Sequence, residues 1–261
     1  RSLSGTRTSF QFGRLKLQTV FSQKKSSNKS VSSKGGKQLT PFEIDVADYE
    51  ENRHFFLSNY FLAHHDAGMR TLPNLATGVK INRVEIWVTN KTGTTSNTRN
   101  IVALTDLGEN NGVSRPDLWG PGSGAVPSNQ ANGEYQTIAQ GHPEARDIDQ
   151  ASSALEGMGL VGGTDFEKLS SARLLSSSEY TVNTSLGYVS LRAGLQADQV
   201  LAVAYEYTYG GVTYQVGEFS SDRTNVGEAL FVKALKNTSN NPAQGNWRLM
   251  MKNVYYLAST V

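Results

Sequence analysis

The chain has 261 residues, enough for one large domain or two small ones, and a net charge of only +2, which excludes a strong overall attraction for nucleic acid. It has no cysteine, so disulfides, thiolate zinc sites and a cysteine nucleophile are excluded. Charged residues make up only 18% of a sequence that is rich in small polar residues and holds 11 Tyr, a composition that favours strands and long turns over helical bundles.

The N-terminal segment alternates between apolar and polar side chains. Over residues 10–22, Leu15, Leu17 and Phe21 fall on one face and basic or polar residues on the other, which predicts a β-strand. This pattern suits a membrane-barrel strand and the half-solvated strand of a soluble sheet equally well. Residues 24–40 are rich in Lys and Ser and predict a loop that contacts solvent or anionic lipid headgroups, with no aromatic residue to stack on nucleic-acid bases.

Three further segments are predicted before residue 105. Asp48 and Glu51 are spaced like a capping box, which predicts a helix over residues 49–62 with an aromatic stripe. Residues 79–90 alternate and predict a strand. Residues 101–104 predict a second strand, paired with the first as a hairpin with a long polar loop.

A long irregular connection is predicted at about residues 108–141, where Gly, Pro and Asn are frequent. Long connections of this kind in compact domains are usually functional or interface loops. We expect Trp119 and Tyr135 within this stretch, and Trp87 on the preceding strand, to contact partner proteins.

The second half of the chain predicts a helix followed by strands. A capping box that begins at Thr164 predicts a helix over residues 164–175. Residues 199–219 predict a hairpin that turns at two successive glycines, since glycine adopts the positive φ of a tight turn. Residues 229–236 predict a short helix or strand, and residues 247–257 a final strand.

Motifs for metal or cofactor chemistry are weak. His64, His65 and Asp66 are adjacent, so they point apart on a helix, and a cationic pair at a helix C-terminus explains the histidines better than a metal site. Residues 157–162 match Gly-x-Gly-x-x-Gly, but no strand precedes them as nucleotide binding requires. The sequence therefore predicts no metal site, no cofactor and no catalytic residue.

Two other functions stay open. The three tryptophans could stack on sugar rings, which would make the chain a surface glycan-binding module with Trp119 as the residue to test. A carboxylate-based hydrolase around Glu144, Asp147 and Asp149 would need a cleft that brings carboxylates within roughly 5–10 Å of one another.

Several long runs resemble, in the same order, the SprA family (Sov in some species), outer-membrane proteins of Bacteroidetes that serve gliding motility and type IX secretion. The runs cover most of residues 10–257, at 41–61, 81–93, 97–109, 166–191, 200–220 and 249–257. Their number and order make this similarity more specific than any short motif in the chain.

The resemblance implies a segment of a very large single-chain β-barrel that conducts folded proteins across the bacterial outer membrane. Residues 1–40 would hold a barrel-type strand and its Lys/Ser-rich loop. Residues 41–261 would form an α+β body, mainly antiparallel β hairpins with a few short helices, inserted beside strands of the large barrel. The implied partners are secreted cargo proteins with a type IX C-terminal signal, a PorV-like outer-membrane protein and a periplasmic plug protein. At this length the chain is expected to be a fragment.

Overall fold

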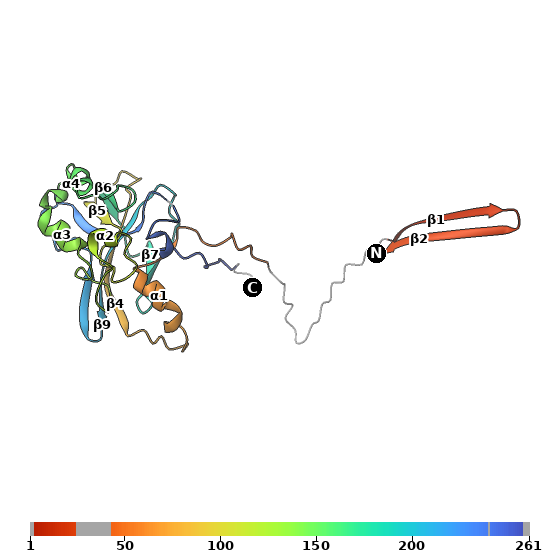
Figure 1. Cartoon of the computed structure of the whole chain (residues 1–261), viewed down its shortest axis with the longest axis horizontal. Coiled ribbons are helices and arrows are strands. Elements are labelled where there is room, and N and C mark those ends of the chain that lie inside the picture. Colours follow the sequence, from red (N-terminus) through yellow and green to blue (C-terminus); the bar gives the residue numbers. More distant parts are fainter. Residues whose placement is uncertain (1–2, 25–42, 240, 258–261) are drawn as a thin grey trace. The chain divides into compact units, whose positions relative to one another are not determined.

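The computed structural model describes residues 3–24, 43–239 and 241–257 (Figure 1). The described residues fall into two units, one up to residue 44 and one from residue 45 onward, and each is described by itself. Strands predominate and the helices are few and short, which confirms the predicted α+β class.

The first unit is a two-stranded antiparallel hairpin of β1 (Leu3–Phe12) and β2 (Leu15–Lys24). The chain turns at Gly13, whose φ of +60° is one that glycine adopts without strain. The single strand predicted over residues 10–22 is therefore wrong, because the turn lies inside that range. The loop predicted over residues 24–40 lies, beyond its first residue, outside the described residues.

Five strands of the second unit close into a small barrel. They are β4 (Val79–Val88), β5 (Thr98–Leu104), β6 (Phe166–Leu174), β9 (Leu201–Tyr209) and β11 (Leu230–Lys236). The order around the barrel is β4, β9, β11, β5, β6 and back to β4. The β5–β11 pair is parallel and the other four pairs are antiparallel.

Strands β5, β9 and β11 and the second half of β4 are largely buried on both faces, whereas β6 is largely exposed on one. In β4 the consecutive residues Ile86, Trp87 and Val88 are all buried, although neighbouring side chains of a strand point to opposite faces. Trp87 belongs to a cluster to which every barrel strand contributes, and β5, β9 and β11 contribute alternate residues, several of them alanine, such as Ala103 and Ala202. This cluster is the barrel interior, where small side chains leave room for the indole ring.

One outer face of the barrel is covered by a three-stranded sheet and a helix. The sheet has the order β3 (His54–Phe56), β8 (Tyr188–Leu191), β7 (Tyr180–Asn183), and the helix is α1 (Asn59–Gly68). The helix predicted over residues 49–62 is therefore wrong, since β3 occupies its centre and α1 begins at Asn59. Pairing of β3 with β8 overrides the local capping signal.

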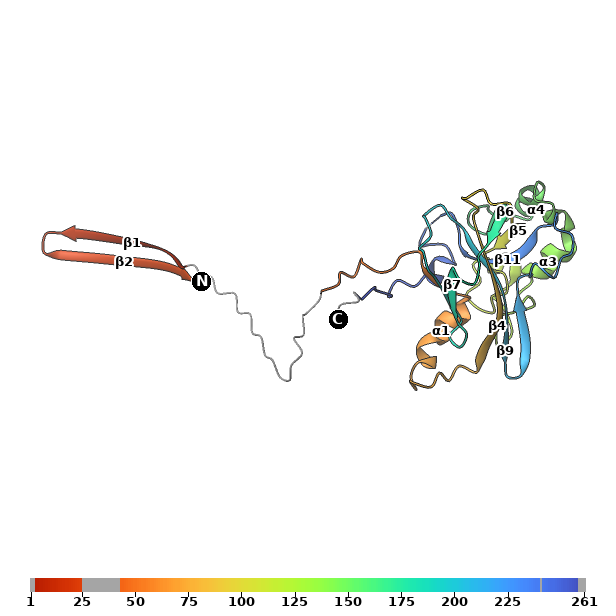
Figure 2. The same cartoon turned by 180° about the vertical axis from the view of Figure 1, so that it is seen from behind.

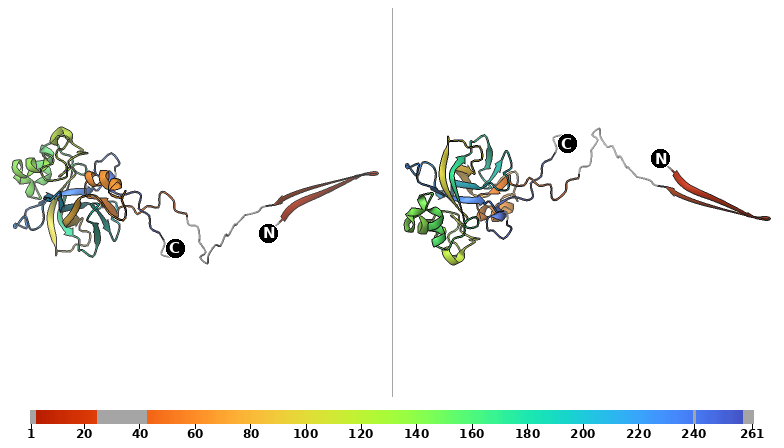
Figure 3. Two further views of the ribbon diagram at one scale, coloured as in Figure 1. Left: turned by 90° about the horizontal axis from the view of Figure 1, so that it is seen from below. Right: turned by 90° about the horizontal axis from the view of Figure 1, so that it is seen from above.

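The opposite outer face is covered by short helices. They are α2 (Pro116–Trp119), α3 (Glu134–Gly141), a 3₁₀ turn (Pro143–Arg146) and α4 (Ala151–Gly157). Figures 1, 2 and 3 show these helices gathered on one side of the barrel strands, with α1 and β7 on the other. Trp119 and Ile138 join the core here, so the predicted irregular connection at 108–141 contains two short helices and buried side chains.

One predicted pairing and one predicted helix are wrong, because strands from distant parts of the chain pair here. β4 and β5 form no hairpin, since β6 lies between them in the barrel. The helix predicted over residues 164–175 is strand β6, and its capping-box Glu167 instead accepts a hydrogen bond from the backbone N–H of Thr238 (2.8 Å). The strands that pair with β6 and make this segment a strand, β4 and β5, come from distant parts of the chain.

The hairpin predicted over residues 199–219 is confirmed. Strands β9 and β10 (Val212–Val216) turn at Gly210 and Gly211, with φ of +57° and +80°. Residues 229–236 contain a strand, β11. The final strand predicted over residues 247–257 is wrong, because the chain there forms a 3₁₀ turn and two isolated bridges to other segments.

Candidate functional site

The aromatic residues predicted to contact partners are largely internal. Trp87 fills the barrel, and Trp119 is buried beneath the helices, so neither ring offers a face to a sugar or a partner in this structure. Tyr135 is half-buried and donates a hydrogen bond to the Glu218 carboxylate (2.9 Å). Burial, and then the Glu218 charge, raise the pKa of Tyr135 to about 12.

The three carboxylates of the hydrolase hypothesis serve local turns. The Asp147 carboxylate accepts hydrogen bonds from the backbone N–H of Asp149 (3.0 Å) and the Gln150 side chain (2.8 Å). Glu144 lies 2.9 Å from the His142 ring, and its own backbone N–H and His142 hold its pKa below the ordinary value. These contacts order the chain ahead of α4 and lend the hydrolase hypothesis no support.

The two adjacent histidines bind different partners. On α1, His64 Nδ1 lies 2.8 Å from the Tyr60 carbonyl oxygen, and the His64 ring stacks on that of Tyr60. His65 Nδ1 lies 3.0 Å from the Asp66 carboxylate. Across residues 3–24, 43–239 and 241–257, no group of three or more His, Cys, Asp or Glu side chains is placed to hold a metal ion.

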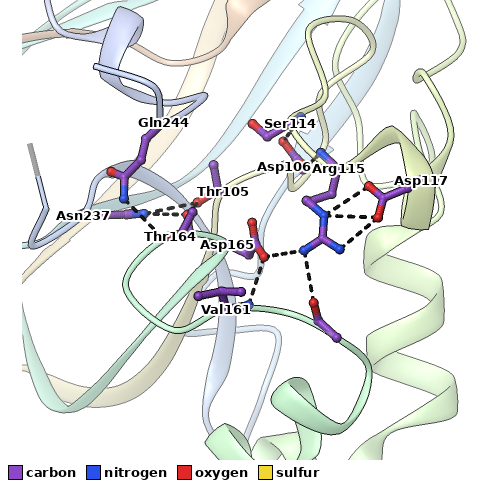
Figure 4. A network of polar contacts seen from close by, with 11 residues as sticks. Thr105, Asp106, Ser114, Arg115, Asp117, Val161, Thr164, Asp165, Asn237 and Gln244 are labelled. Carbon is purple, nitrogen blue, oxygen red and sulfur yellow. Dashed lines mark hydrogen bonds and ion pairs between the residues drawn. The ribbon is translucent and has the colours of Figure 1, made fainter. Parts of the chain in front are cut away.

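The glycine-rich loop at 157–162 is held by a polar network that Figure 4 shows from close by. The Asp165 carboxylate accepts hydrogen bonds from the Val161 backbone N–H (2.9 Å) and from Arg115 (2.7 Å). Arg115 also donates to the Gly159 carbonyl (3.1 Å) and to Asp117, which lowers the pKa of Asp117. The loop is therefore a structural turn between α4 and β6.

The same network ties the 108–141 connection to the barrel (Figure 4). The Asp106 carboxylate, just beyond β5, accepts the backbone N–H groups of Ser114 (2.7 Å) and Arg115 (2.8 Å). Asn237, just beyond β11, donates to the Thr164 carbonyl (2.9 Å). Since these partners are protein groups of the same unit, the network stabilises the fold.

Charged side chains are buried beside this network. Lys233 Nζ lies 3.0 Å from the Glu109 carboxylate, and both side chains are 1% exposed. Glu109 also accepts the backbone N–H of Asn59 (3.1 Å) and so caps the N-terminus of α1, where a negative charge is favourable. Burial raises the pKa of Glu109, and Lys233 opposes that rise. Glu134 is buried nearby, and its Oε2 has no hydrogen-bond partner among the described residues.

Replacing Glu134 by glutamine is expected to raise the free energy of unfolding near pH 7 by about 1–3 kcal/mol, because each unit by which folding raises the pKa of a carboxyl costs about 1.4 kcal/mol of stability at higher pH. Burial, and then the Asp106 charge, hold the pKa of Glu134 well above its ordinary value. The folded state therefore binds this proton more tightly than the unfolded state, and wild-type stability falls as pH rises above the ordinary glutamate pKa. The Glu134→Gln variant has no carboxyl at this position, so its stability does not fall with rising pH for this reason.

Urea unfolding at pH 5 and pH 8 measures the Glu134 effect. The matched control is Glu156→Gln, which changes an exposed glutamate and should leave the pH dependence as it is. Equal pH dependence in wild type and Glu134→Gln would show that Glu134 is not the group that titrates.

The outer face of the three-stranded sheet forms the floor of a groove of about 940 Å³. Cross-strand pairing puts Phe56 opposite Tyr188 and His54 opposite Ser190, and all four side chains line the floor. The opposite face of the sheet, with Phe55 and its cross-strand partner, packs into the core. The groove is therefore built on the outer face of a sheet whose inner face packs into the core.

The groove has two walls. One is α1 with the arm at 69–75 that follows it, and this arm carries Met69, Leu72 and Leu75 with exposed side chains. The other wall is the segment 247–254, which contributes two methionines and two cations. These lining residues come from three distant parts of the chain, so no local motif could have indicated them.

Three polar side chains at the edge of the groove are arranged like a hydrolytic triad. His54 Nδ1 lies 2.8 Å from Ser190 Oγ, and His54 Nε2 lies 2.8 Å from the Glu50 carboxylate. Glu50 also forms an ion pair with Arg53. Ser190 lies on β8, the central strand of its sheet, whose backbone N–H groups serve the pairings to β3 and β7 and are not available to stabilise an oxyanion. The hydrogen bond between His54 and Ser190 holds strand β3 against strand β8.

The hairpin of the first unit has one apolar and one polar face. The register pairs Phe10 with Leu17 and Phe12 with Leu15, and these four side chains are 49–70% exposed. On the other face Arg7 donates to the Gln18 side chain (3.0 Å). A hairpin with this pattern needs an apolar environment on one side.

A comparison with protein families shows which family this chain belongs to. The model of the SprA_N family, described as motility related/secretion protein, matches residues 1–208. The chain belongs to the SprA_N family. No curated protein matches it.

The SprA_N match confirms the resemblance read from the long runs of sequence and includes both the hairpin and the groove floor. The groove wall at 247–254 lies beyond the matched residues. In the part of the chain that the structure describes, no helix combines the length and apolar character needed to cross a lipid bilayer.

Proposed function

We propose that this chain is a segment of the type IX secretion translocon of the bacterial outer membrane and serves protein export and gliding motility through protein contacts, without catalysis. Membership of a family of motility related/secretion proteins supports this role. The observation that carries the proposal is the hairpin of two ten-residue strands with one exposed apolar face. Transmembrane β-strands have about this length, 9–11 residues.

The hairpin needs neighbours to be stable. An isolated two-stranded hairpin is marginal in water, and its free strand edges invite pairing. In a barrel wall the outer edges pair with further strands, and the face with Phe12, Leu15 and Leu17 meets hydrocarbon. The face with Arg7 and Gln18 then borders the polar lumen, as in outer-membrane barrels.

The second unit acts through contacts in this proposal. The interior of its small barrel is filled by side chains, and its triad-like Ser190, His54 and Glu50 hold a sheet together. The partners that we propose are secreted cargo proteins with a type IX C-terminal signal, a PorV-like outer-membrane protein and a periplasmic plug protein. The open groove is the surface best suited to such contacts.

Changing Leu17 to aspartate in the complete protein is expected to abolish secretion, whereas changing its neighbour Gln18 to aspartate is not. The two residues are adjacent in β2, but Leu17 is on the apolar face and Gln18 is on the polar face. A charge facing lipid costs up to about 2–4 kcal/mol in an outer-membrane barrel, and less for Asp than for Lys or Arg. The measurements are secreted cargo, gliding, and the amount of protein in the outer-membrane fraction.

Equal outcomes for Leu17→Asp and Gln18→Asp would contradict the proposed barrel wall. Deletion of residues 108–141 is a poorer test of function, because it removes the buried Trp119, Val126 and Ile138 and so disturbs the core.

A further inference from the structure

We propose that the groove of the second unit binds an apolar, acidic polypeptide segment of a partner protein, an inference that rests on the proposed role in protein contacts and names the surface and its chemistry. The groove volume of about 940 Å³ is at the upper end of the range for ligand sites. Apolar side chains make up more of the lining than polar ones, so the occupant must carry several large apolar side chains.

Methionines make the groove adaptable. Met69, Met250 and Met251, three of the four methionines in the chain, line it; Met69 is exposed, whereas Met250 and Met251 reach the groove from the core and are 8% and 7% exposed. Unbranched thioether side chains repack around differently shaped partners, and surfaces that bind several proteins use them for this reason. Leu72 on the arm is 60% exposed and adds apolar surface to that wall of the groove. Exposed apolar side chains gathered on one wall, as Met69, Leu72 and Leu75 are, favour an interaction site.

The charges on the walls select an acidic occupant. The wall at 247–254 carries Arg248 and Lys252 and no carboxylate. Lys252 is held in place, since its Nζ donates to the Trp247 and Met250 carbonyls (2.8 Å each) and lies 3.7 Å from the Trp247 ring centroid. The carboxylate among the lining residues belongs to Asp66 on the opposite wall, where it is exposed and paired with His65.

Polar groups spaced along the groove favour a polypeptide over a lipid chain. The Asn253 side chain on the wall can exchange hydrogen bonds with a peptide backbone, and the Tyr188 hydroxyl on the floor, which accepts one from Asn183, can donate another. A fatty acyl chain would cover these groups without pairing them, which carries a desolvation cost.

The test uses the full 261-residue chain and a fluorescein-labelled ten-residue peptide that contains Leu, Phe and Asp. A second peptide has Lys in place of every Asp. Fluorescence anisotropy should show at least tenfold tighter binding of the Asp peptide. Arg248→Glu should shift this preference toward the Lys peptide.

Leu72→Asp should weaken binding of the Asp peptide at least tenfold, because it places a carboxylate on the apolar wall. Its side chain is exposed, so the fold should persist, and circular dichroism checks this. The matched control is Val226→Asp, which changes an apolar residue that is 71% exposed and does not line the groove. Binding to that variant should equal wild type.

Equal binding of the two peptides, or binding that survives Leu72→Asp, would overturn the inference. So would displacement of the Asp peptide by a short-chain phosphatidylglycerol at equal concentration, which would assign the groove to lipid. A dimer of the chain that Leu72→Asp dissociates would assign it to a second copy. If the groove fails these tests while Leu17→Asp still abolishes secretion, the proposed function stands and only the occupant is wrong.

Discussion

Replacing Lys233 by methionine is expected to lower the free energy of unfolding by about 3–5 kcal/mol, the usual result of removing one partner from a buried ion pair. The Lys233 ammonium group lies 3.0 Å from the Glu109 carboxylate and donates to the Thr105 carbonyl (2.8 Å). Without it, the buried Glu109 carboxylate keeps only the Asn59 backbone N–H as a donor among the described hydrogen bonds. Methionine matches the length of the lysine side chain, so the loss of stability measures the effect of removing the charge and not the packing.

Urea unfolding measures the Lys233 effect, and the double variant Lys233→Met/Glu109→Gln is its control. The double variant should recover much of the lost stability, because no charge then remains unpaired. Burial already raises the pKa of Glu109, and the single variant removes the cation that opposes this rise. The folded state then favours the protonated carboxyl, so the single variant should lose more stability at pH 8 than at pH 5. A double variant as unstable as the single one would contradict this explanation.

Replacing Gly187 by alanine is expected to destabilise the second unit by about 2–5 kcal/mol, the sum of backbone strain and overpacking. Gly187 has φ +66°, and an added Cβ would lie 2.3 Å from Cδ1 of Phe61. Phe61 cannot move away, because its ring packs against those of Tyr205 and Tyr207. The turn between β7 and β8, and with it the floor of the groove, depends on this glycine.

Gly210→Ala separates strain from steric overlap. Gly210 has a similar φ of +57°, but an added Cβ would meet nothing within 4 Å. The Gly210→Ala control should therefore lose only the free energy that corresponds to backbone strain, about 1–2 kcal/mol. Thermal unfolding of both variants checks the difference. Equal losses would show that the Phe61 overlap is relieved by movement of the chain.

Features set by neighbouring residues were predictable from the sequence. Strand β4 follows from its alternating pattern, and the β9–β10 hairpin follows from its alternation and its Gly210–Gly211 turn. Both depend on contacts or dihedral preferences within a few residues. The long ordered runs of similarity also identified the family, because many positions together carry more information than a short motif.

Local signals failed where distant partners decided the structure. The capping box at Thr164 predicts a helix, but residues 166–174 complete the barrel between β4 and β5. Pairing with both neighbours satisfies the backbone of β6 and buries Phe166 and Leu169, which outweighs a capping preference of about 1 kcal/mol. The same reason explains β3 at the centre of the helix predicted over residues 49–62.

Alternation along the chain established that Leu15, Leu17 and Phe21 share one face and that Val84, Ile86 and Val88 share another, and the long ordered runs established the resemblance to SprA. Only the tertiary structure decided what covers each face. It buried Trp87 inside a closed barrel, packed Trp119 beneath helices, and brought residues 54–75, 183–190 and 247–254 together around one groove. The reason is physical: periodicity depends on the local backbone, whereas burial depends on which distant segment packs against each face.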